Sequence, residues 1–329
     1  MDTLLQVRNL YTQFETRHGV ARVLRGLTVD VPRGQTLGIV GESGSGKTVT
    51  ALSIMRLIRP PGVITSGHII FRGRNLLSLS EREMEEVRGD RITMIFQHPR
   101  ESLNPVLSIG AQIGMVLRRH PRLSGRRALD RARELLRLVE LPDADRILRA
   151  YPHQLSGGMC QRVMIALCIA CGPDLLIADE ATTALDVTVQ LQILRLLRRL
   201  REELGLTLIV ITHNLGVVAE ICQWVAVMYA GELVELGTVH DVFRAPRHPY
   251  TARLLACRPT LTGLADLPVI SGSVPDLITL PQGCPFHPRC PHAQRRCSEE
   301  APALEERGPV HRVRCFYPEE VGAWSASST

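Results

Sequence analysis

Hydrophobic positions recur along this chain with two different periods. Strand-like alternation or short apolar runs, bounded by turn residues, predict strands at residues 3–9, 22–32, 35–40, 69–71, 92–96, 175–178, 207–211 and 225–228. Helical periodicity follows some of these runs, most clearly at residues 47–57 and 187–204. Strands that alternate with helices of this length predict an α/β fold with a mainly parallel sheet. The alternation in the first two strands predicts an antiparallel β patch near the N-terminus.

The pattern changes twice along the chain. From about residue 108 to residue 148 it becomes helical and rich in Arg, Glu and Leu, which predicts a helical subdomain at about residues 100–170. After about residue 257, Pro, Gly and Cys crowd the sequence and helical periodicity fades. We therefore expect a main domain at residues 1–257 and a C-terminal extension at residues 258–329.

Composition and charge exclude several classes. A hydrophobic fraction of 45% over 329 residues is typical of a globular protein. The net charge of +6 permits an anionic partner, but no dense basic block with interleaved aromatic residues occurs, so we expect no nucleic acid. The start lacks a signal-peptide pattern, and the longest apolar runs are too short to cross a bilayer. These features predict a cytosolic protein, or one held to a membrane only through partners.

Lysine is almost absent. Lysine and arginine together number 39, and Lys47 is the only lysine among them. Because a compact ammonium is retained where the planar guanidinium is used everywhere else, position 47 is expected to be a chemical site.

Lys47 lies in a glycine-rich segment between a predicted strand and a predicted helix. Residues 41–48 (GESGSGKT) fit the pattern G-x-x-x-x-G-K-[ST] in the structural context that this motif requires. The glycines let backbone N–H groups approach phosphate oxygens, Lys47 would pair with the β- and γ-phosphates, and Thr48 would bind Mg²⁺. The predicted nucleotide-binding residues of this loop are Gly41, Ser43, Gly44, Ser45, Gly46, Lys47 and Thr48.

Two carboxylates end the apolar run at residues 175–178. Asp179 is placed to hold Mg²⁺, and Glu180, one residue later, can accept a proton from an attacking water. An acidic pair at a strand end can be purely structural, but the phosphate loop upstream favours the catalytic interpretation.

Residues 155–162 (LSGGMCQR) resemble the signature motif of ABC-type ATPases. The motif begins with a serine that can cap a helix and two glycines that open its N-terminus, an arrangement suited to binding an anion. The resemblance implies that Ser156, Gly157 and Gly158 contact the γ-phosphate of ATP held by a second ATPase subunit. A dimer is then required.

The same resemblance assigns further roles. It implies that Gln97 contacts Mg²⁺ and the attacking water, that His213 touches the γ-phosphate and positions the water of Glu180, and that residues 183–186 form the D-loop, with Asp186 at the nucleotide. Phe14 stands where the family stacks an aromatic ring on adenine, although core packing is an equal use for this residue and for the nearby Tyr11.

The chain bears a closer resemblance to the ATPase subunits of bacterial oligopeptide, dipeptide and nickel importers. It is carried by residues 96–99 (FQHP), 102–105 (SLNP), 151–158 (YPHQLSGG), 184–190 (ALDVTVQ), 248–251 (HPYT) and 283–286 (GCPF). It implies two transmembrane permease subunits, a second ATPase subunit that is expected to be a paralogue, an extracytoplasmic binding protein, and a place on the cytoplasmic face of the inner membrane. Peptide import is the expected function. A nickel or small-solute importer, an exporter, and an ABC ATPase of DNA repair or translation remain alternatives.

Three residues depart from the family pattern: Ala181 replaces a proline, Cys160 an arginine, and Asn214 an aspartate. None of them removes a proton-transfer or phosphate-binding group, so we expect activity.

Four of the nine cysteines gather in the extension. Cys284, Cys290, Cys297 and Cys315 are separated by 5, 6 and 17 residues. Clustered thiolates suit a soft metal centre, so a [4Fe–4S] cluster, Zn²⁺ and free thiols are all open on the residues alone. The resemblance to dipeptide transporter subunits implies the [4Fe–4S] cluster. We interpret the neighbouring His287, His292 and His311 as solvated loop residues.

Overall fold

The computed structural model describes residues 2–119, 123–181, 186–257, 270–308, 310–318 and 321. The chain forms two compact units, and each is built from segments that are distant in sequence. The first unit contains residues 1–2, 32–36 and 78–211, and the second contains residues 3–31, 37–77 and 212–329.

The first unit has a parallel sheet. Its strands β6 (Ile92–Ile95), β7 (Leu175–Asp179) and β8 (Thr207–Ile211) pair in parallel, with Ile177 of β7 between Met94 and Ile209. Every residue of these strands is buried. Strands covered on both faces need continuous apolar runs, and this explains why the sequence predicted them as runs without alternation.

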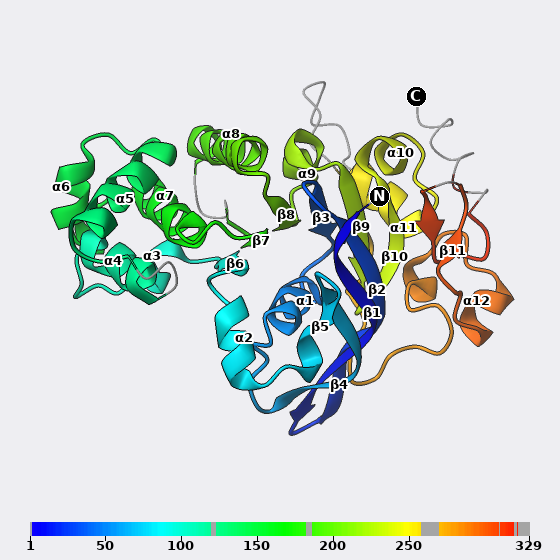
Figure 1. Cartoon of the computed structure of the whole chain (residues 1–329). Coiled ribbons are helices and arrows are strands. Elements are labelled where there is room, and N and C mark those ends of the chain that lie inside the picture. The colour runs from blue at the N-terminus through cyan, green and yellow to red at the C-terminus, as the bar shows by residue number, and fades with distance from the viewer. Residues whose placement is uncertain are drawn as a thin grey trace. The chain divides into compact units, whose positions relative to one another are not determined.

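Helices make up the rest of the first unit (Figure 1). They are α2 (Glu81–Val87), α3 (Pro99–Ser102), α4 (Ile109–Arg119), α5 (Gly125–Leu138), α6 (Ala144–Arg149), α7 (Gly157–Ile169) and α8 (Val187–Leu204). In α5, Ala128, Ala132, Leu135 and Leu136 form the buried stripe of an amphipathic helix. Helices α3 to α7 pack on one another and confirm the predicted helical subdomain.

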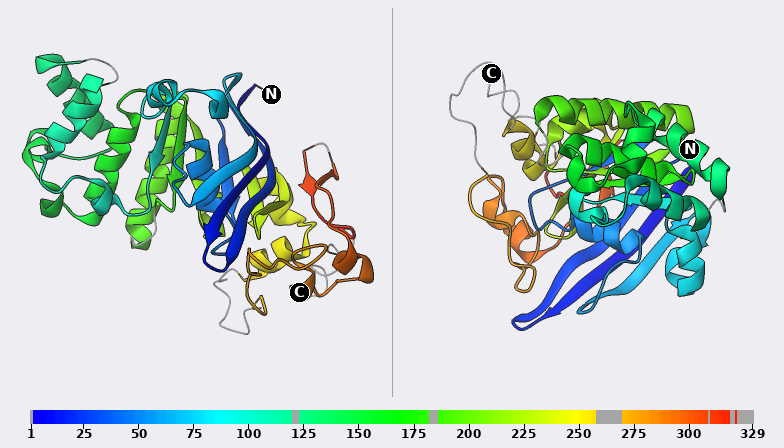
Figure 2. Two further views of the ribbon diagram at one scale, coloured as in Figure 1. Left: turned by 90° about the horizontal axis from the view of Figure 1, so that it is seen from below. Right: turned by 90° about the vertical axis from the view of Figure 1, so that its left-hand side faces the viewer.

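The second unit contains the expected antiparallel patch. Its sheet has the order β2 (Gly19–Pro32), β1 (Thr3–Thr16), β4 (Gly62–Phe71) and β5 (Arg74–Asn75). Figure 2 shows β1, β2 and β4 as long neighbouring ribbons coloured blue to cyan. The strands are longer than the alternation predicted, because the half-exposed ends of β1 and β2 carry polar side chains.

A second sheet in this unit carries the phosphate loop at one strand. Strand β3 (Thr36–Val40) runs parallel to β9 (Trp224–Tyr229), which pairs antiparallel with β10 (Glu232–Thr238). Strand β10 was not predicted. Its two glutamates interrupt the apolar pattern, yet Glu235 is fully buried.

One histidine of the extension and two backbone N–H groups that precede the extension satisfy this buried carboxylate. His311 lies 2.7 Å from a Glu235 carboxylate oxygen, and the backbone N–H groups of Arg247 and His248 donate to the same carboxylate. Strand β12 (Arg312–Val313) pairs with β10 and with β11 (Glu305–Glu306). The interpretation of His311 as a solvated residue is therefore wrong, because it is the buried partner of a buried acid.

The remaining elements of the second unit are short. Its helices are α1 (Lys47–Ile54), α9 (Leu215–Ile221), α10 (Val239–Arg244), α11 (Pro249–Ala256) and α12 (Arg295–Glu299). The described residues also form the 3₁₀ turns η1 (Leu76–Ser78), η2 (Pro152–Gln154) and η3 (His287–Arg289). The expected boundary between residues 257 and 258 adjoins residues 258–269, which lie outside the described part, so that division stays a prediction. None of the described helices has the length and apolar character needed to span a membrane.

Candidate nucleotide site and cysteine pocket

The phosphate loop joins the end of β3 to the start of α1, and two of its glycines admit no side chain. A Cβ on Gly41, whose φ is +154°, would lie 2.2 Å from the Met228 carbonyl oxygen. A Cβ on Gly46, whose φ is +101°, would lie 2.9 Å from the Val23 carbonyl oxygen. The loop is thus pressed against β9 and β2, and only glycine fits at these two positions.

The inside of the loop is suited to an anion. The Lys47 side chain is buried, and its Nζ donates to the carbonyl oxygens of Gly41 and Glu42 at 2.8 and 2.9 Å. The Ser45 hydroxyl is buried and has no hydrogen-bond partner among the described residues. Gly46 provides no side-chain cap for α1. A helix N-terminus with an ammonium and an unsatisfied hydroxyl beside it is a typical phosphate site.

The other loop residues surround this interior. Ser43, Gly44 and Thr48 are exposed, and Thr48 is the second residue of α1. The structure therefore brings the predicted phosphate-binding residues together in one loop of the second unit.

The predicted hydrolytic residues Gln97, Asp179 and Glu180 belong to the first unit. Asp179 is buried at the end of β7. Glu180 follows it with φ +47°, a left-handed conformation that costs a non-glycine residue about 1–2 kcal/mol. The Gln97 side-chain amide donates to the Glu180 carboxylate at 3.0 Å. Backbone strain and a direct contact between two predicted functional side chains are typical of a catalytic position.

The signature segment has the local structure that its sequence predicts. Ser156 is the N-cap of α7, and its hydroxyl accepts a hydrogen bond from the Met159 N–H at 3.3 Å. A Cβ on Gly158 would lie 2.9 Å from the Val189 side chain, so Gly158 lets α7 pack closely on α8. Gly157 is the first residue of α7.

Three other predicted residues have local partners. Asp186 caps α8 and accepts from the Val189 N–H at 2.9 Å, while residues 183–185 of the predicted D-loop lie outside the described residues. His213 is exposed and stands just before Asn214, whose side chain caps α9. Phe14 pairs with Gly62 across β1 and β4, and its ring occupies the space that a side chain at position 62 would need. The roles of these residues toward a nucleotide stay predictions.

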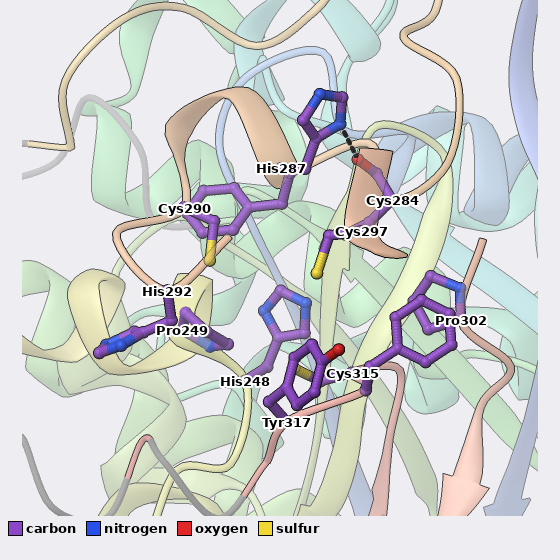
Figure 3. A pocket seen from close by; sticks show the side chains of 12 residues that line it. His248, Pro249, Cys284, His287, Cys290, His292, Cys297, Pro302, Cys315 and Tyr317 are labelled. Carbon is purple, nitrogen blue, oxygen red and sulfur yellow. Dashed lines mark hydrogen bonds between the residues drawn. The ribbon is translucent and has the colours of Figure 1, made fainter. Parts of the chain in front are cut away.

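The four cysteines of the extension line one pocket in the second unit (Figure 3). Figure 3 shows the sulfur atoms of Cys290 and Cys297 directed into the space beside the His248 ring. Burial raises the pKa of Cys284 to about 11 and that of Cys315 to about 12.

The histidines of this pocket differ in their surroundings. His287 and His292 are half-buried, and Nδ1 of His287 lies 2.9 Å from the Cys284 carbonyl oxygen. Within the described part of the chain, no three His, Cys, Asp or Glu side chains lie close enough to hold a single metal ion. Cys284, Cys290, Cys297 and Cys315 all border this pocket, but the structure does not bring three of them to metal-binding distance of one another.

Comparison with known proteins decides the family. Residues 24–183 match the model of the ABC transporter family, and residues 234–297 match that of the oligopeptide/dipeptide transporter C-terminal region. The chain is 51% identical to a probable peptide ABC transporter ATP-binding protein, y4tR, of Sinorhizobium fredii, over 97% of this chain and 96% of that protein. It is 45% identical to the dipeptide transport ATP-binding protein DppD of Bacillus subtilis, over 97% and 96% of the two chains.

The chain belongs to the ABC transporter ATPases. Among solved structures it is similar to the dimeric ATP-binding cassette MJ0796 in a post-hydrolysis state bound to ADP and Pi, with a TM-score of 0.64 and 29% identity over 71% of this chain and 98% of that one. The predicted fold class is confirmed, and the activity of this ABC ATPase is the hydrolysis of ATP.

The departures from the family pattern are accommodated in this ABC ATPase. Cys160 is buried, with its sulfur 3.5 Å from the Pro152 carbonyl oxygen. The Asn214 side chain accepts from the Gly216 N–H at 2.8 Å and so begins α9. Ala181 is buried directly after Glu180.

Two residues at the phosphate loop of this ABC ATPase were not predicted. The Tyr250 hydroxyl accepts a hydrogen bond from the Glu42 N–H at 2.8 Å, and Arg289 forms an ion pair with the Glu42 carboxylate. Tyr250 stands in the segment 248–251 that carried the family resemblance, but nothing in the sequence indicates its partner. No pattern connects residues 42 and 289.

Proposed function

We propose that this chain binds ATP and Mg²⁺ in its phosphate loop and hydrolyses ATP to drive the import of peptides across the inner membrane. The observation that carries the proposal is the loop interior, where the Lys47 ammonium, the unsatisfied Ser45 hydroxyl and the N-terminus of α1 come together. The printed functions of the relatives, which are peptide and dipeptide transport, support the substrate class.

Binding is assigned to the loop. Backbone N–H groups from Gly41 to Thr48 hold the phosphates, and Lys47 pairs with the β- and γ-phosphates. Thr48 and Asp179 bind Mg²⁺, which would neutralise charge on the phosphate oxygens. Phe14 stacks on the adenine ring.

Hydrolysis is assigned to Gln97 and Glu180, which follow strands β6 and β7. Glu180 would take a proton from the attacking water at a carboxylate oxygen while the water oxygen bonds to the γ-phosphorus and ADP leaves with the bridging oxygen, and Gln97 would contact the water and Mg²⁺. The contact between Gln97 and Glu180 supports their joint action, because it already holds the carboxylate in one orientation. His213 touches the γ-phosphate and fixes the position of the water.

Completion of the site requires a second ATPase subunit. Ser156, Gly157 and Gly158 present the start of α7 to the γ-phosphate of the nucleotide held by that subunit, and Asp186 lies in the adjoining D-loop. The capped start of α7 supports this role. The partner is proposed to be a paralogue of this chain.

Transport is assigned to further subunits. Two transmembrane permeases, on whose cytoplasmic side this chain sits, carry the peptide, and an extracytoplasmic binding protein delivers it. The match of residues 234–297 to the oligopeptide/dipeptide transporter C-terminal region supports this assignment over an exporter or a nucleic-acid-linked ATPase.

We propose in addition that Cys284, Cys290, Cys297 and Cys315 hold a [4Fe–4S] cluster. Such a cluster would join segments of the extension that otherwise have few elements of secondary structure. Anaerobic purification followed by iron and sulfide analysis is expected to give about four of each per chain, and replacement of Cys297 by Ser should remove them. A colourless, iron-free wild-type protein would overturn this assignment.

The catalytic assignment is tested with Glu180→Gln in the assembled transporter. The variant should bind ATP but hydrolyse it at least about 100-fold more slowly, because general-base catalysis typically contributes 10²–10⁴-fold. Glu134→Gln is the matched control, since Glu134 is an exposed residue of α5 whose ion pair with Arg131 is local. Normal hydrolysis by the Glu180 variant would show that the base has been misassigned.

The transport assignment is tested by purification of the chain with its membrane partners. Two membrane proteins and an extracytoplasmic binding protein should co-purify, and vesicles containing them should take up labelled peptides only when ATP is supplied. ATP-dependent uptake of nickel without uptake of peptides would refute the peptide assignment but leave the ATPase assignment intact.

A further inference from the structure

Arg289, in the cysteine-bearing segment of the extension, reaches the second residue of the phosphate loop. Its Nη1 and Nη2 donate to the two carboxylate oxygens of Glu42 at 2.8 and 3.0 Å. The Arg289 side chain is only 6% exposed, and that of Glu42 is 28% exposed. A bidentate pair shielded from water in this way is stronger and more directional than a surface ion pair.

Arg289 has little freedom to leave this position. Its Nε donates to the Ser271 carbonyl oxygen at 2.9 Å, and Nη1 lies 3.2 Å from the Tyr229 hydroxyl. Nη2 also lies 3.3 Å from the carbonyl oxygens of Ile270 and Gly272. All the donor nitrogens of the guanidinium are therefore used, and its plane is fixed.

The backbone of Glu42 is held from the same side. Its N–H donates to the Tyr250 hydroxyl, whose ring packs on Tyr229 and Phe286 with centroid separations of 4.7 and 5.5 Å. The Glu42 carbonyl oxygen in turn accepts a hydrogen bond from Lys47 Nζ. A chain of contacts thus runs from the extension, through Glu42, to the lysine of the phosphate loop.

The same chain begins beside the cysteine pocket. Arg289 ends η3 and directly precedes Cys290, and Phe286 lies between Cys284 and η3 in the sequence. Cys284, Cys290 and Phe286 all line the pocket. The position of the guanidinium therefore depends on how the pocket segment is folded.

Charge gives this pair a consequence for nucleotide binding. The bare carboxylate of Glu42, in a loop that surrounds phosphates, would repel them. The Arg289 guanidinium neutralises this carboxylate and prevents it from turning inward. Loss of Arg289 would leave the negative charge of Glu42 unpaired. It would also free Glu42 to move, although the Glu42 carbonyl oxygen is an acceptor for Lys47 Nζ.

We propose that Arg289 is a positioning residue for the nucleotide site, through which the cysteine-bearing segment sets the affinity of the phosphate loop for ATP. The inference rests on the proposed role of that loop. It predicts that Arg289→Gln weakens nucleotide binding, and that Glu42→Gln, added to it, restores the binding.

The test is a double-mutant cycle on the full-length chain, measured by titration with a fluorescent ATP analogue and Mg²⁺. Arg289→Gln should weaken binding about tenfold, a typical size for a coupling between sites. Adding Glu42→Gln to it should restore most of the affinity, because the unpaired carboxylate is then gone. The affinity of Arg289→Lys for the ATP analogue should lie between that of the wild type and that of Arg289→Gln, since lysine keeps the positive charge but cannot form the bidentate pair.

A matched control is available in the same extension. Arg295 forms only an exposed ion pair with Glu299, four residues later in the chain, so Arg295→Gln should bind the nucleotide like the wild type. In the assembled transporter, Arg289→Gln should raise the KM for ATP about tenfold with less than about a twofold change in kcat.

The outcomes separate this inference from the proposed function. Failure of the wild-type chain to bind the nucleotide would refute the nucleotide site itself. Tight binding by the wild type and equally tight binding by Arg289→Gln would refute the role of Arg289 alone. Weak binding by Arg289→Gln that Glu42→Gln does not restore would also refute it, because the loss would then come from general damage to the extension.

Discussion

Mild acid should destabilise this protein through one buried histidine. His248 is only 2% exposed, and its Nδ1 accepts the Tyr250 N–H at 3.1 Å, so the neutral ring caps the start of α11. Burial, and to a lesser extent the positive charge of Arg314, lowers the pKa of His248 to about 3. In the unfolded chain the pKa of a histidine is about 6.5.

The sign and size of the effect follow from these two pKa values. Above about pH 6.5 neither state binds the proton, and the free energy of unfolding is unaffected by this residue. Below about pH 6.5 the unfolded chain is protonated but the folded chain is not. The free energy of unfolding then falls by about 1.4 kcal/mol for each pH unit until the folded pKa is approached. Between pH 7.5 and pH 5.5 the expected loss is about 1.4 kcal/mol.

Urea unfolding at the two pH values measures this loss. His248→Asn retains a side-chain oxygen that can cap α11 but does not titrate, so its pH dependence should be smaller than that of the wild type by about 1.4 kcal/mol. The same pH dependence in the wild type and in His248→Asn would refute the reasoning.

Four further substitutions test local claims. Gly41→Ala should abolish nucleotide binding, because the new Cβ would lie 2.2 Å from the Met228 carbonyl oxygen. In Gly44→Ala the new Cβ would have no described atom within 4 Å, so this variant should cost only about 1–2 kcal/mol of backbone strain. Equal nucleotide binding by both variants, measured by titration, would contradict this. Ser156→Ala should lower the free energy of unfolding by about 1 kcal/mol through loss of the α7 cap, and unchanged urea midpoints would contradict it. Glu140→Gln should lower stability by less than about 1 kcal/mol, because the glutamate is half-exposed although two arginines lower its pKa. This loss should be complete at pH 7 and shrink as the pH falls below about 4.5 toward the lowered pKa of the folded state, and a loss that does not change between pH 7 and pH 3 would count against the ion pairs.

Local chemistry made much of the fold predictable. The phosphate loop was found because a glycine-rich turn and a lone lysine have physical requirements that appear at fixed spacings. The signature helix was found through its resemblance to ABC-type ATPases, and its serine cap agrees with that resemblance. The parallel strands were found because burial on both faces demands continuous apolar runs. Strand β10 was missed because its buried Glu235 looks like a surface residue until His311, 76 positions away, is seen beside it.

The contacts of the extension could not be predicted for the same reason. Arg289 is one of many arginines in the sequence, and its pairing with Glu42 spans 247 positions. The four cysteines all line one pocket, but no three of them lie close enough to hold a single metal ion, so the predicted metal centre stays a prediction. Spacing alone does not determine how far apart their sulfur atoms lie, because that distance depends on how η3, α12 and β12 pack.

The central claim is that the loop from Gly41 to Thr48 holds the phosphates of ATP. Isothermal titration of the purified chain with ATP and Mg²⁺ tests it most directly, with Lys47→Ala measured in parallel. The account predicts saturable binding of one ATP per wild-type chain and at least about a hundredfold weaker binding by Lys47→Ala. Removal of the ammonium leaves a phosphate charge unpaired, and this should reduce the binding free energy by about 2.7 kcal/mol or more. Equal affinity of the two proteins for ATP would contradict it.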